Sequence, residues 1–358
     1  MTVLLTITIL ILTGIAIWQI TKIFELSQIG LKKDDSQIAT EKDNDLNGKL
    51  MFGFLVFIYI VTIYCFWAYT KVLLPESASE HGEKYDTLLW VSFAIILFAQ
   101  TLTQAVLHYF AFKYRGINNR KAYFFTHNNK LELVWTVIPA IIFFVLIIYG
   151  MVTWGQIMNF NEDNEDDLVI ELYAQQWNWK ARYGGEDNVL GDANVRFLND
   201  FDGKNSVGID SSDPNGMDDF VVTQEFHLPV NRKVIFKMRS QDVLHSAYMP
   251  HFRAQMNCVP GMITEFSFTP TITTEEMRQN SDVVAKVTRI NKIRYDRSQD
   301  LISNGEEGLD SYQFDYLLLC AKICGTSHYN MQMKIVVESE KDYIKWKAQQ
   351  QTFSEIIQ

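Results

Sequence analysis

The distribution of apolar residues divides the chain into two unlike parts. The first part contains four long, almost entirely apolar stretches, each close to or above the roughly 20 residues that a helix needs to cross a bilayer. These predicted membrane helices cover residues 3–20, 50–74, 87–112 and 131–157. The first stretch lacks the basic start and the small-residue cleavage site of a signal peptide, so we interpret it as a retained span. The pattern therefore predicts a membrane region with four helices over residues 1–160.

After residue 160 the apolar runs become short and their period changes to two. Leu168, Ile170 and Leu172 fall on one face of the first run, and the second run ends at two glycines, a turn signal. Similar runs lie at residues 220–228, 233–239, 263–268, 314–320 and 332–338. Many short strands separated by turns indicate a β-sandwich or a β-barrel. The predicted second domain covers residues 161–341, with a charged linker at 161–167 and a C-terminal tail at 342–358.

Two long insertions interrupt this predicted all-β domain. Residues 184–219 are rich in Gly, Asn and Asp and predict an extended loop. Residues 271–315 begin with Thr273-Thr-Glu-Glu276, which is a capping-box pattern, and continue with apolar residues at near-helical spacing. The second insertion therefore predicts a helical excursion of roughly two to three turns or more.

Charge separates the two parts as clearly as hydropathy does. The chain has a formal net charge of −10, and residues from Ile157 onward hold 31 acidic and 20 basic side chains. Such an acidic surface makes nucleic-acid binding an unsuitable interpretation. Basic residues crowd the loops between the first and second and between the third and fourth predicted helices: Lys22, Lys32, Lys33, Lys42 and Lys49, then Lys113, Arg115, Arg120, Lys121 and Lys130. The positive-inside rule places these loops in the cytoplasm and the second domain on the external side.

One stretch concentrates candidate metal ligands: Cys320-Ala-Lys-Ile-Cys324-Gly-Thr-Ser-His328-Tyr-Asn-Met331. Thiolate, imidazole and thioether together favour copper over hard cations. Zinc is the alternative metal, although structural zinc sites usually use CxxC pairs and rarely methionine. A disulfide between the two cysteines is a further alternative, but it leaves the histidine and the methionine unexplained. A cluster this compact needs a ligand from elsewhere, and His245 is the best candidate.

His245 followed by the CxxxCGxxHxxM loop resembles the dinuclear copper (CuA) site of cytochrome c oxidase subunit II, a subunit of haem–copper terminal oxidases. The resemblance implies two copper ions with two bridging thiolates, two capping imidazoles and two weak outer ligands: Cys320 and Cys324, His245 and His328, and Met331 with the backbone carbonyl of Lys322. The family usually has glutamate at the position of Lys322, and its carboxylate helps to hold Mg²⁺. Because an ammonium group cannot ligate Mg²⁺, we expect no side-chain metal ligand from this position.

Four further polar residues of this domain are predicted to support the structure and not to bind metal. Ligating histidines usually donate their second N–H to a carboxylate or carbonyl, and Asp242 lies three residues before His245. We therefore expect Asp242 to support that histidine or the boundary with subunit I. His227, His251 and Cys258 match no ligand position and are interpreted as structural.

Two further motifs resemble subunit II. The stretch His127-Asn-Asn-Lys-Leu-Glu132-Leu-Val-Trp135-Thr-Val-Ile-Pro139-Ala resembles the start of the second of the family's two spans, which makes the first two predicted helices an addition and suggests a bacterial variant. The resemblance implies that Glu132 is a mouth of the proton channel into subunit I; an interfacial carboxylate among basic neighbours is the alternative. Gln176-Trp177-Asn-Trp179 resembles a motif whose first tryptophan receives electrons, whereas a packed sheet aromatic is the alternative, since both rings are expected on one strand face.

The resemblance implies a Greek-key, cupredoxin-like fold for the second domain and an oxidoreductase function for the complex. The chain would accept electrons from a cytochrome c, or from a cytochrome c domain such as that of a neighbouring respiratory complex. It would pass them to the haem of subunit I, where oxygen is reduced to water with proton pumping. No CxxCH sequence is present, so the chain itself carries no such haem attachment. The quinol-oxidase branch of the family lacks the copper ligands, which are present here.

The same resemblance implies a place in the cell and a set of partners. We expect a multi-pass protein of the bacterial cytoplasmic (inner) membrane, with the copper domain on the periplasmic side and with lipid, subunit I and other oxidase subunits around the spans. A membrane-anchored copper-delivery protein with a cupredoxin domain is the alternative function. Such a carrier would bind one exchangeable Cu(I), whereas an electron-transfer site would be dinuclear and coloured.

Overall fold

The computed structural model describes residues 2–29, 40–117, 120–121, 123–159, 164 and 166–357. Most of the predicted charged linker at 161–167 lies outside the described residues, as do Lys32 and Lys33 of the first basic loop.

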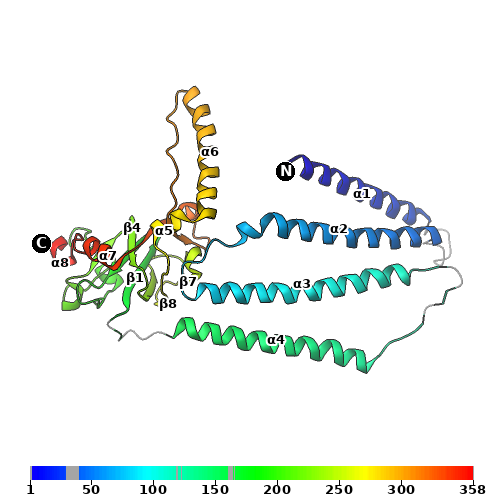
Figure 1. Cartoon of the computed structure of the whole chain (residues 1–358), viewed down its shortest axis with the longest axis horizontal. Helices are drawn as coiled ribbons and strands as arrows, with labels where there is room; N and C mark the ends of the chain where they lie inside the picture. Colours follow the sequence, from blue (N-terminus) through cyan, green and yellow to red (C-terminus); the bar gives the residue numbers. More distant parts are fainter. Residues whose placement is uncertain are drawn as a thin grey trace. The chain divides into compact units, whose positions relative to one another are not determined.

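The first part of the chain forms four long helices, each apolar enough to cross a membrane. Their bounds are α1 Thr2–Ile29, α2 Glu41–Leu73, α3 Gly82–Lys113 and α4 Asn129–Met158 (Figure 1). Most of their large apolar side chains point outward and are exposed, which is the pattern of helices that face lipid. Each helix is longer than its predicted apolar stretch, because polar residues next to that stretch continue the same backbone hydrogen bonding, although α2 ends one residue before its predicted end. The prediction of four membrane helices is confirmed.

The second part folds into a sandwich of two five-stranded sheets, which confirms the prediction of an all-β, cupredoxin-like domain. One sheet has the order β3-β2-β1-β5-β8 and the other the order β4-β10-β9-β6-β7. The strands of the first sheet are β1 Leu168–Gln175, β2 Asn178–Tyr183, β3 Phe220–Val222, β5 Val234–Ser240 and β8 Thr264–Phe268. Those of the second are β4 Glu225–Pro229, β6 His245–Met249, β7 Ala254–Cys258, β9 Tyr316–Cys320 and β10 Gln332–Glu338.

Strand β1 is buried on both faces, which explains its nearly continuous apolar sequence. Its even-numbered residues, such as Ile170 and Leu172, enter the core between the two sheets. Tyr173 points the other way and packs against Val207 and Ile209 of the first insertion. The insertion at 184–219 therefore covers the outer face of its sheet, and it contains the short helices η2 Val195–Phe197 and η3 Pro214–Gly216.

Three strand predictions need correction. Residues 220–228 do not form one strand: β3 and β4 are separate and belong to different sheets. Strands β6 and β7 were not predicted at all, because their five-residue sequences, HSAYM and AQMNC, have no clear alternation of apolar and polar side chains. Strand β2 begins at Asn178, so Trp177 lies in the preceding turn and does not share a strand face with Trp179.

The second insertion is helical, as predicted, and projects from the sandwich (Figure 1). It consists of α5 Thr274–Gln279 and α6 Ser281–Ser303, followed by a returning segment that hydrogen-bonds along α6. The expected capping box is present, since Thr273 and Glu276 bond each other's backbone N–H groups. Asn291 binds the backbone of Tyr312 through both its amide oxygen and its amide nitrogen. The remaining short helices are η4 Pro250–Phe252, η5 His328–Asn330, α7 Glu340–Lys347 and α8 Phe353–Ile357.

The connection between α2 and α3 is fastened to the β-domain next to η4. Arg253, whose side chain is almost fully buried, binds Asp86 of α3 through Nε at 2.7 Å and Nη2 at 2.7 Å. The same guanidinium donates to the carbonyl of Pro75 at 2.6 Å. Ser79 donates to the carbonyl of Phe252 at 2.8 Å. These bonds tie the first turn of α3 to the same compact unit as the sandwich.

A buried ion cluster lies between the first sheet and the insertion that covers it. Arg182, only 1% exposed, binds Glu171 at 3.0 Å and Asp219 at 2.6 Å, and also donates to the carbonyl of Gly191. Arg239 pairs with Glu171 and donates to the carbonyl of Val207 at 3.1 Å. Charges this deeply buried are tolerated only when each is paired and hydrogen-bonded.

We expect Arg182→Met to destabilise the external domain by about 3–5 kcal/mol, because it leaves the buried Asp219 carboxylate without its cation and removes one of the two cations that pair with Glu171. The measurement is the free energy of unfolding of the purified chain in urea, followed by near-ultraviolet circular dichroism of its aromatic residues. Lys345→Met is the matched control, since its pair with Asp342 is exposed on α7 and should be worth less than about 1 kcal/mol. Equal stability of the two variants would contradict a supporting role for the cluster.

Candidate metal centre

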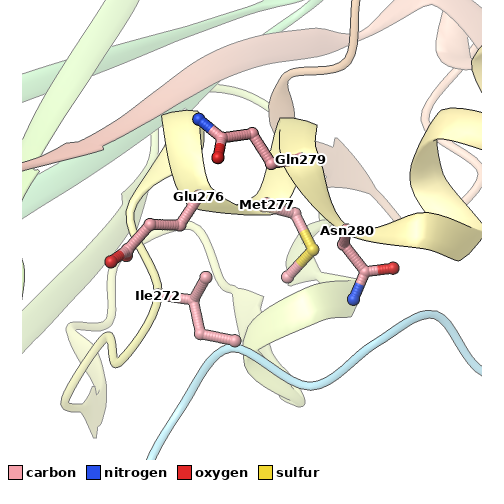
Figure 2. Close-up of a pocket in the computed structure, with 5 residues that line it drawn as sticks. All are labelled: Ile272, Glu276, Met277, Gln279 and Asn280. Carbon is pink, nitrogen blue, oxygen red and sulfur yellow. The ribbon is translucent and has the colours of Figure 1, made fainter.

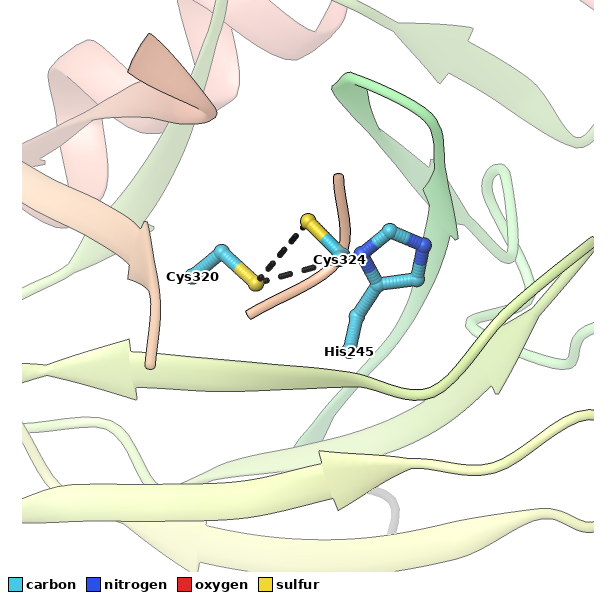
Figure 3. Close-up of side chains that lie close together, drawn as sticks. All are labelled: His245, Cys320 and Cys324. Carbon is cyan, nitrogen blue, oxygen red and sulfur yellow. Dashed lines mark hydrogen bonds between the residues drawn. The ribbon is translucent and has the colours of Figure 1, made fainter. Parts of the chain in front are cut away.

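Three segments of the second sheet bring the predicted ligands together at one end of the sandwich. His245 is the first residue of β6, Cys320 is the last residue of β9, and Cys324 lies in the loop that follows (Figure 3). His328 begins η5, and Met331 lies immediately before β10. Because β6 pairs with β9 and β9 with β10, residues distant in sequence converge on one small volume.

The donor atoms form a chain of contacts in which each thiol has its own histidine. The sulfurs of Cys320 and Cys324 are 3.8 Å apart. His245 Nδ1 lies 3.8 Å from the Cys320 sulfur, and His328 Nδ1 lies 3.6 Å from the Cys324 sulfur. The outer ligands complete the set: the carbonyl oxygen of Lys322 is 3.1 Å from the Cys320 sulfur, and Met331 Sδ is 3.8 Å from the Cys324 sulfur.

These distances distinguish a metal site from a disulfide. A disulfide requires sulfurs about 2.05 Å apart, and both cysteines are free. The side-chain donor atoms of His245, Cys320 and Cys324 all lie within 4.8 Å of one another, which is close enough to share an ion. Two sulfurs 3.8 Å apart can also be bridged by one ion, since thiolate–metal bonds of about 2.3 Å span that gap. The residues present therefore fit soft metal ions.

Because the site is buried, its thiols need a bound cation to lose their protons. His245 is fully buried and Cys324 is 5% exposed. Burial, together with the adjacent Cys320, raises the pKa of the Cys324 thiol to about 11. Metal ligation requires the thiolate, which a bound cation stabilises. Binding of a soft cation should therefore release protons from this pair.

Asp242 holds His245 in the orientation that the site needs. Its Oδ1 lies 2.8 Å from His245 Nε2, which leaves Nδ1 facing the cysteine sulfur. Its Oδ2 accepts a 2.7 Å hydrogen bond from the backbone N–H of Gln176. Burial alone would raise the pKa of Asp242, but hydrogen bonds from Gln176, His245 and Val243 lower it overall. The expectation that Asp242 supports the histidine is confirmed.

Trp177 is seated directly on the loop at residues 320–331, which holds five of the six predicted copper ligands and is therefore called the copper loop. Its indole Nε1 donates to the carbonyl of Cys324 at 3.3 Å, and the side-chain amide of Gln176 donates to the same oxygen at 2.6 Å. Gly325 has a φ of +127°, and a Cβ there would lie 2.9 Å from the Trp177 ring. The glycine is needed both for its backbone conformation and for the close approach of the indole. Trp179, by contrast, is buried, with its ring edge-on to His245.

Sequence reasoning missed one residue beside the site. Cys258 lies far from the loop in sequence and was interpreted as structural, but β6 and β7 place it directly opposite His245. It is completely buried, and burial raises the pKa of its thiol to about 12. Only the pairing of the two unpredicted strands could have revealed its position. Its packing in the core agrees with a structural role.

The other candidate residues lie elsewhere. Glu132 stands exposed in the first turn of α4, where its carboxylate accepts from the backbone N–H of Asn128 at 3.4 Å. His227 stacks on Trp346, and His251 bonds the carbonyl of Glu76. A surface hollow of about 360 Å³ next to α5 shares no residue with the metal site; it is lined by Ile272, Glu276, Met277, Gln279 and Asn280 (Figure 2).

Comparison with known proteins places this geometry in a family. The model described as "Cytochrome C oxidase subunit II, transmembrane domain" matches residues 67–152, and that of the subunit's periplasmic domain matches residues 168–289. The alternative cytochrome c oxidase subunit 2 of Bradyrhizobium diazoefficiens is 32% identical over 270 residues, covering 75% of this chain and 81% of that protein. The chain belongs to the cytochrome c oxidase subunit II family.

Other members of the subunit II family are more distant. Cytochrome c oxidase subunit 2 of Cereibacter sphaeroides is 24% identical over 277 residues, covering 74% of each chain. The probable subunit 2 of Rickettsia conorii is 26% identical over 311 residues, covering 84% of this chain and 79% of that protein. The periplasmic-domain match ends at residue 289, within α6, so the loop at residues 320–331 lies beyond it, and the ligands in that loop stay a prediction.

Membership of the subunit II family defines the type of protein. The chain is the electron-transfer subunit of an oxidoreductase complex and works together with the other oxidase subunits. It is a multi-pass membrane protein with an external domain of the copper-binding type. Helix α1 and most of α2 precede the region that matches the family's transmembrane domain.

We expect Asp242→Ala to lower the copper affinity of this subunit II by about 10- to 100-fold, because His245 loses the partner that orients it. The measurement is competition for copper against a chelator of known affinity, followed by absorption. Asp296→Ala is the control, since Asp296 is exposed on α6 away from the metal site. An unchanged affinity in Asp242→Ala would mean that the carboxylate only fixes the backbone of Gln176.

Proposed function

We propose that this subunit II accepts electrons from a cytochrome c at a dinuclear CuA centre and passes them to the haem of subunit I. The donor is a separate cytochrome c, or a cytochrome c domain such as that of a neighbouring respiratory complex. Oxygen is reduced to water in subunit I, with proton pumping. The proposed ligands are His245, Cys320, the backbone carbonyl of Lys322, Cys324, His328 and Met331.

The observation that carries the proposal is the symmetry of the donor set. Two thiols 3.8 Å apart each face a separate imidazole, and each sulfur also contacts one weaker donor, a carbonyl or a thioether. A single ion must be reached by all of its donor atoms at once, and His328 is not in the group of His245, Cys320 and Cys324, whose donor atoms lie within 4.8 Å of one another. Here one imidazole contacts each sulfur, which suits two ions with shared thiolates. When bound, the copper pair supplies reversible one-electron chemistry.

The protein's own residues would keep this chemistry fast and reversible. The Asp242 carboxylate fixes one imidazole, and β6 and β9 fix the first thiol through their backbone pairing. Burial of His245 and Cys324 excludes water from the ligands. A rigid ligand set changes little when an electron arrives or leaves, so little reorganisation opposes transfer. Trp177 offers a covalent and hydrogen-bonded route from the surface to the Cys324 carbonyl.

The surface near Trp177 suits transient docking of a donor. Trp177 is 38% exposed, and Ile323 and Tyr329 of the copper loop are 86% and 88% exposed. Apolar side chains of this kind form the centre of an interface, with charged groups at its rim. The acidic excess from Ile157 onward favours a donor with a basic docking face and speeds its approach at low salt. Helix α6 is an exception to the acidic excess of this domain, since it carries five basic and three acidic residues.

The membrane part would complete the path of protons and the cellular location. We propose that Glu132, at the cytoplasmic start of α4, lies at the mouth of the proton channel that enters subunit I. An exposed ionisable group at the edge of a span is suited to exchange protons with the aqueous phase. The proposed location is the bacterial cytoplasmic membrane, with the copper domain on the periplasmic side.

We expect Cys324→Ser to abolish the dinuclear centre, so that the purified chain loses its pair of copper ions and its thiolate-to-copper absorption. Met331→Leu should keep both ions and mainly shift the reduction potential, because an axial thioether bonds weakly. Metal analysis together with the absorption spectrum measures both effects. Cys65→Ser is the matched control, because Cys65 is a free cysteine on α2.

Two results would contradict the proposed centre. Retention of two copper ions and the normal spectrum in Cys324→Ser would show that the assigned ligands are wrong. A wild-type chain with one colourless, readily exchanged Cu(I) would instead identify a copper-delivery protein.

We expect Trp177→Phe to slow electron transfer from cytochrome c while leaving the copper spectrum intact, because phenylalanine lacks the N–H that contacts Cys324. Stopped-flow reduction of the purified oxidase over a range of salt concentrations measures the rate. Tyr295→Phe, an exposed aromatic on α6, is the control and should leave the rate unchanged. A wild-type rate in Trp177→Phe would mean that the indole is only a packed aromatic.

A further inference from the structure

A groove lies between α2 and α3, next to the C-terminal end of α3. It has a volume of about 340 Å³ and is lined by Lys49, Phe52, Gly53, Val56 and Phe112. This volume lies within the range of about 300–1,000 Å³ for pockets that hold small molecules. All five residues belong to one compact unit of the structure, and four of them lie on α2 before the region matched by the family.

The groove exists because a glycine, Gly53, lies next to two phenylalanines in its lining, Phe52 and Phe112. The rings of Phe52 and Phe112 pack against each other with centroids 5.7 Å apart. A Cβ added at Gly53 would meet no atom within 4 Å, so the glycine leaves an open notch in α2. Two polar contacts hold the helices together: Asp45 binds Arg115 at 2.8 Å, and Tyr59 donates to the carbonyl of Thr101 at 2.7 Å. These contacts join α2 to α3 both before and after the stretch of α2 that lines the groove.

Positive charge is placed at one end of this apolar notch. The Asp45 carboxylate is shared by Lys49 at 2.6 Å and Arg115 at 2.8 Å, so two cations face one anion. Arg115 lies over the Phe112 ring at 4.3 Å, and Lys113 lies over Tyr109 at 5.3 Å. Aromatic and basic residues together mark the level of the lipid headgroups. An apolar groove with a cation at headgroup depth matches a phospholipid in both charge and polarity.

We propose that this groove binds one anionic phospholipid, with an acyl chain against Gly53 and the phosphate beside Lys49. A neighbouring transmembrane helix is the less suitable occupant. Close helix packing uses small residues four positions apart, but the residues four positions from Gly53 are Lys49 and Phe57. Basic pockets between membrane helices on the cytoplasmic side, where the positive-inside rule places this end of the helices, are typical sites for anionic headgroups.

The test is native mass spectrometry of the purified oxidase containing the full chain, with phosphatidylglycerol or phosphatidylcholine added in detergent. The wild type should retain phosphatidylglycerol in preference to phosphatidylcholine. Lys49→Gln should reduce that preference about fivefold, the contribution of one basic residue near a membrane surface. Gly53→Phe should fill the notch and abolish retention of the bound lipid.

Gly14→Phe is the matched control, because Gly14 lies on α1 and also has no atom within 4 Å of an added Cβ. It should retain lipid as the wild type does. Wild-type lipid retention in Gly53→Phe would overturn the proposal. If Gly53→Phe loses an oxidase subunit and not the lipid, the groove is a helix-docking site and the proposal is likewise wrong. If Gly53→Phe does not assemble, an unchanged lipid preference in Lys49→Gln overturns the proposal by itself.

Discussion

The antiparallel pairing of β6 with β9 is the constraint on which the metal centre depends. It sets Ala247 opposite Cys320, and it thereby brings His245, two residues earlier, to the sulfur of that cysteine. A slip of one residue would turn every side chain of β6 to the other face of the sheet. Neither strand is long, so the register relies on the neighbours β7 and β10 and on the apolar core beneath them. Ligand geometry is thus a property of the whole second sheet.

The sequence was most informative where physical requirements are local. A membrane helix needs only a sufficient apolar length, and the four spans were therefore visible. The copper loop compresses five of the six proposed ligands into residues 320–331, where their chemical types and spacing point to soft metal ions without knowledge of the fold. The helical second insertion was predictable for the same reason, since the cap from Thr273 to Glu276 is contained in four residues.

Features that depend on distant pairing were not visible in the sequence. His245 could be selected as a ligand by its likeness to a family site, but its strand could not, because β6 has no period-two pattern. Cys258 came next to the site only through the β6–β7 register. The position of Trp177 differed from the expected one because β2 starts one residue later, so the indole is set by a turn and by the Cys324 carbonyl. Each of these features is a consequence of tertiary structure overriding local pattern.

The two oxygens of Asp242 connect parts of the site that could otherwise vary separately. One oxygen orients a proposed metal ligand, and the other holds the backbone of the turn that presents the indole. A change in this carboxylate would therefore act on the proposed metal ligand and on the proposed docking surface at the same time. Under the proposed function, tuning the reduction potential through His245 would also move the point of contact with the donor. The driving force and the docking geometry of the proposed electron transfer would then be mechanically coupled.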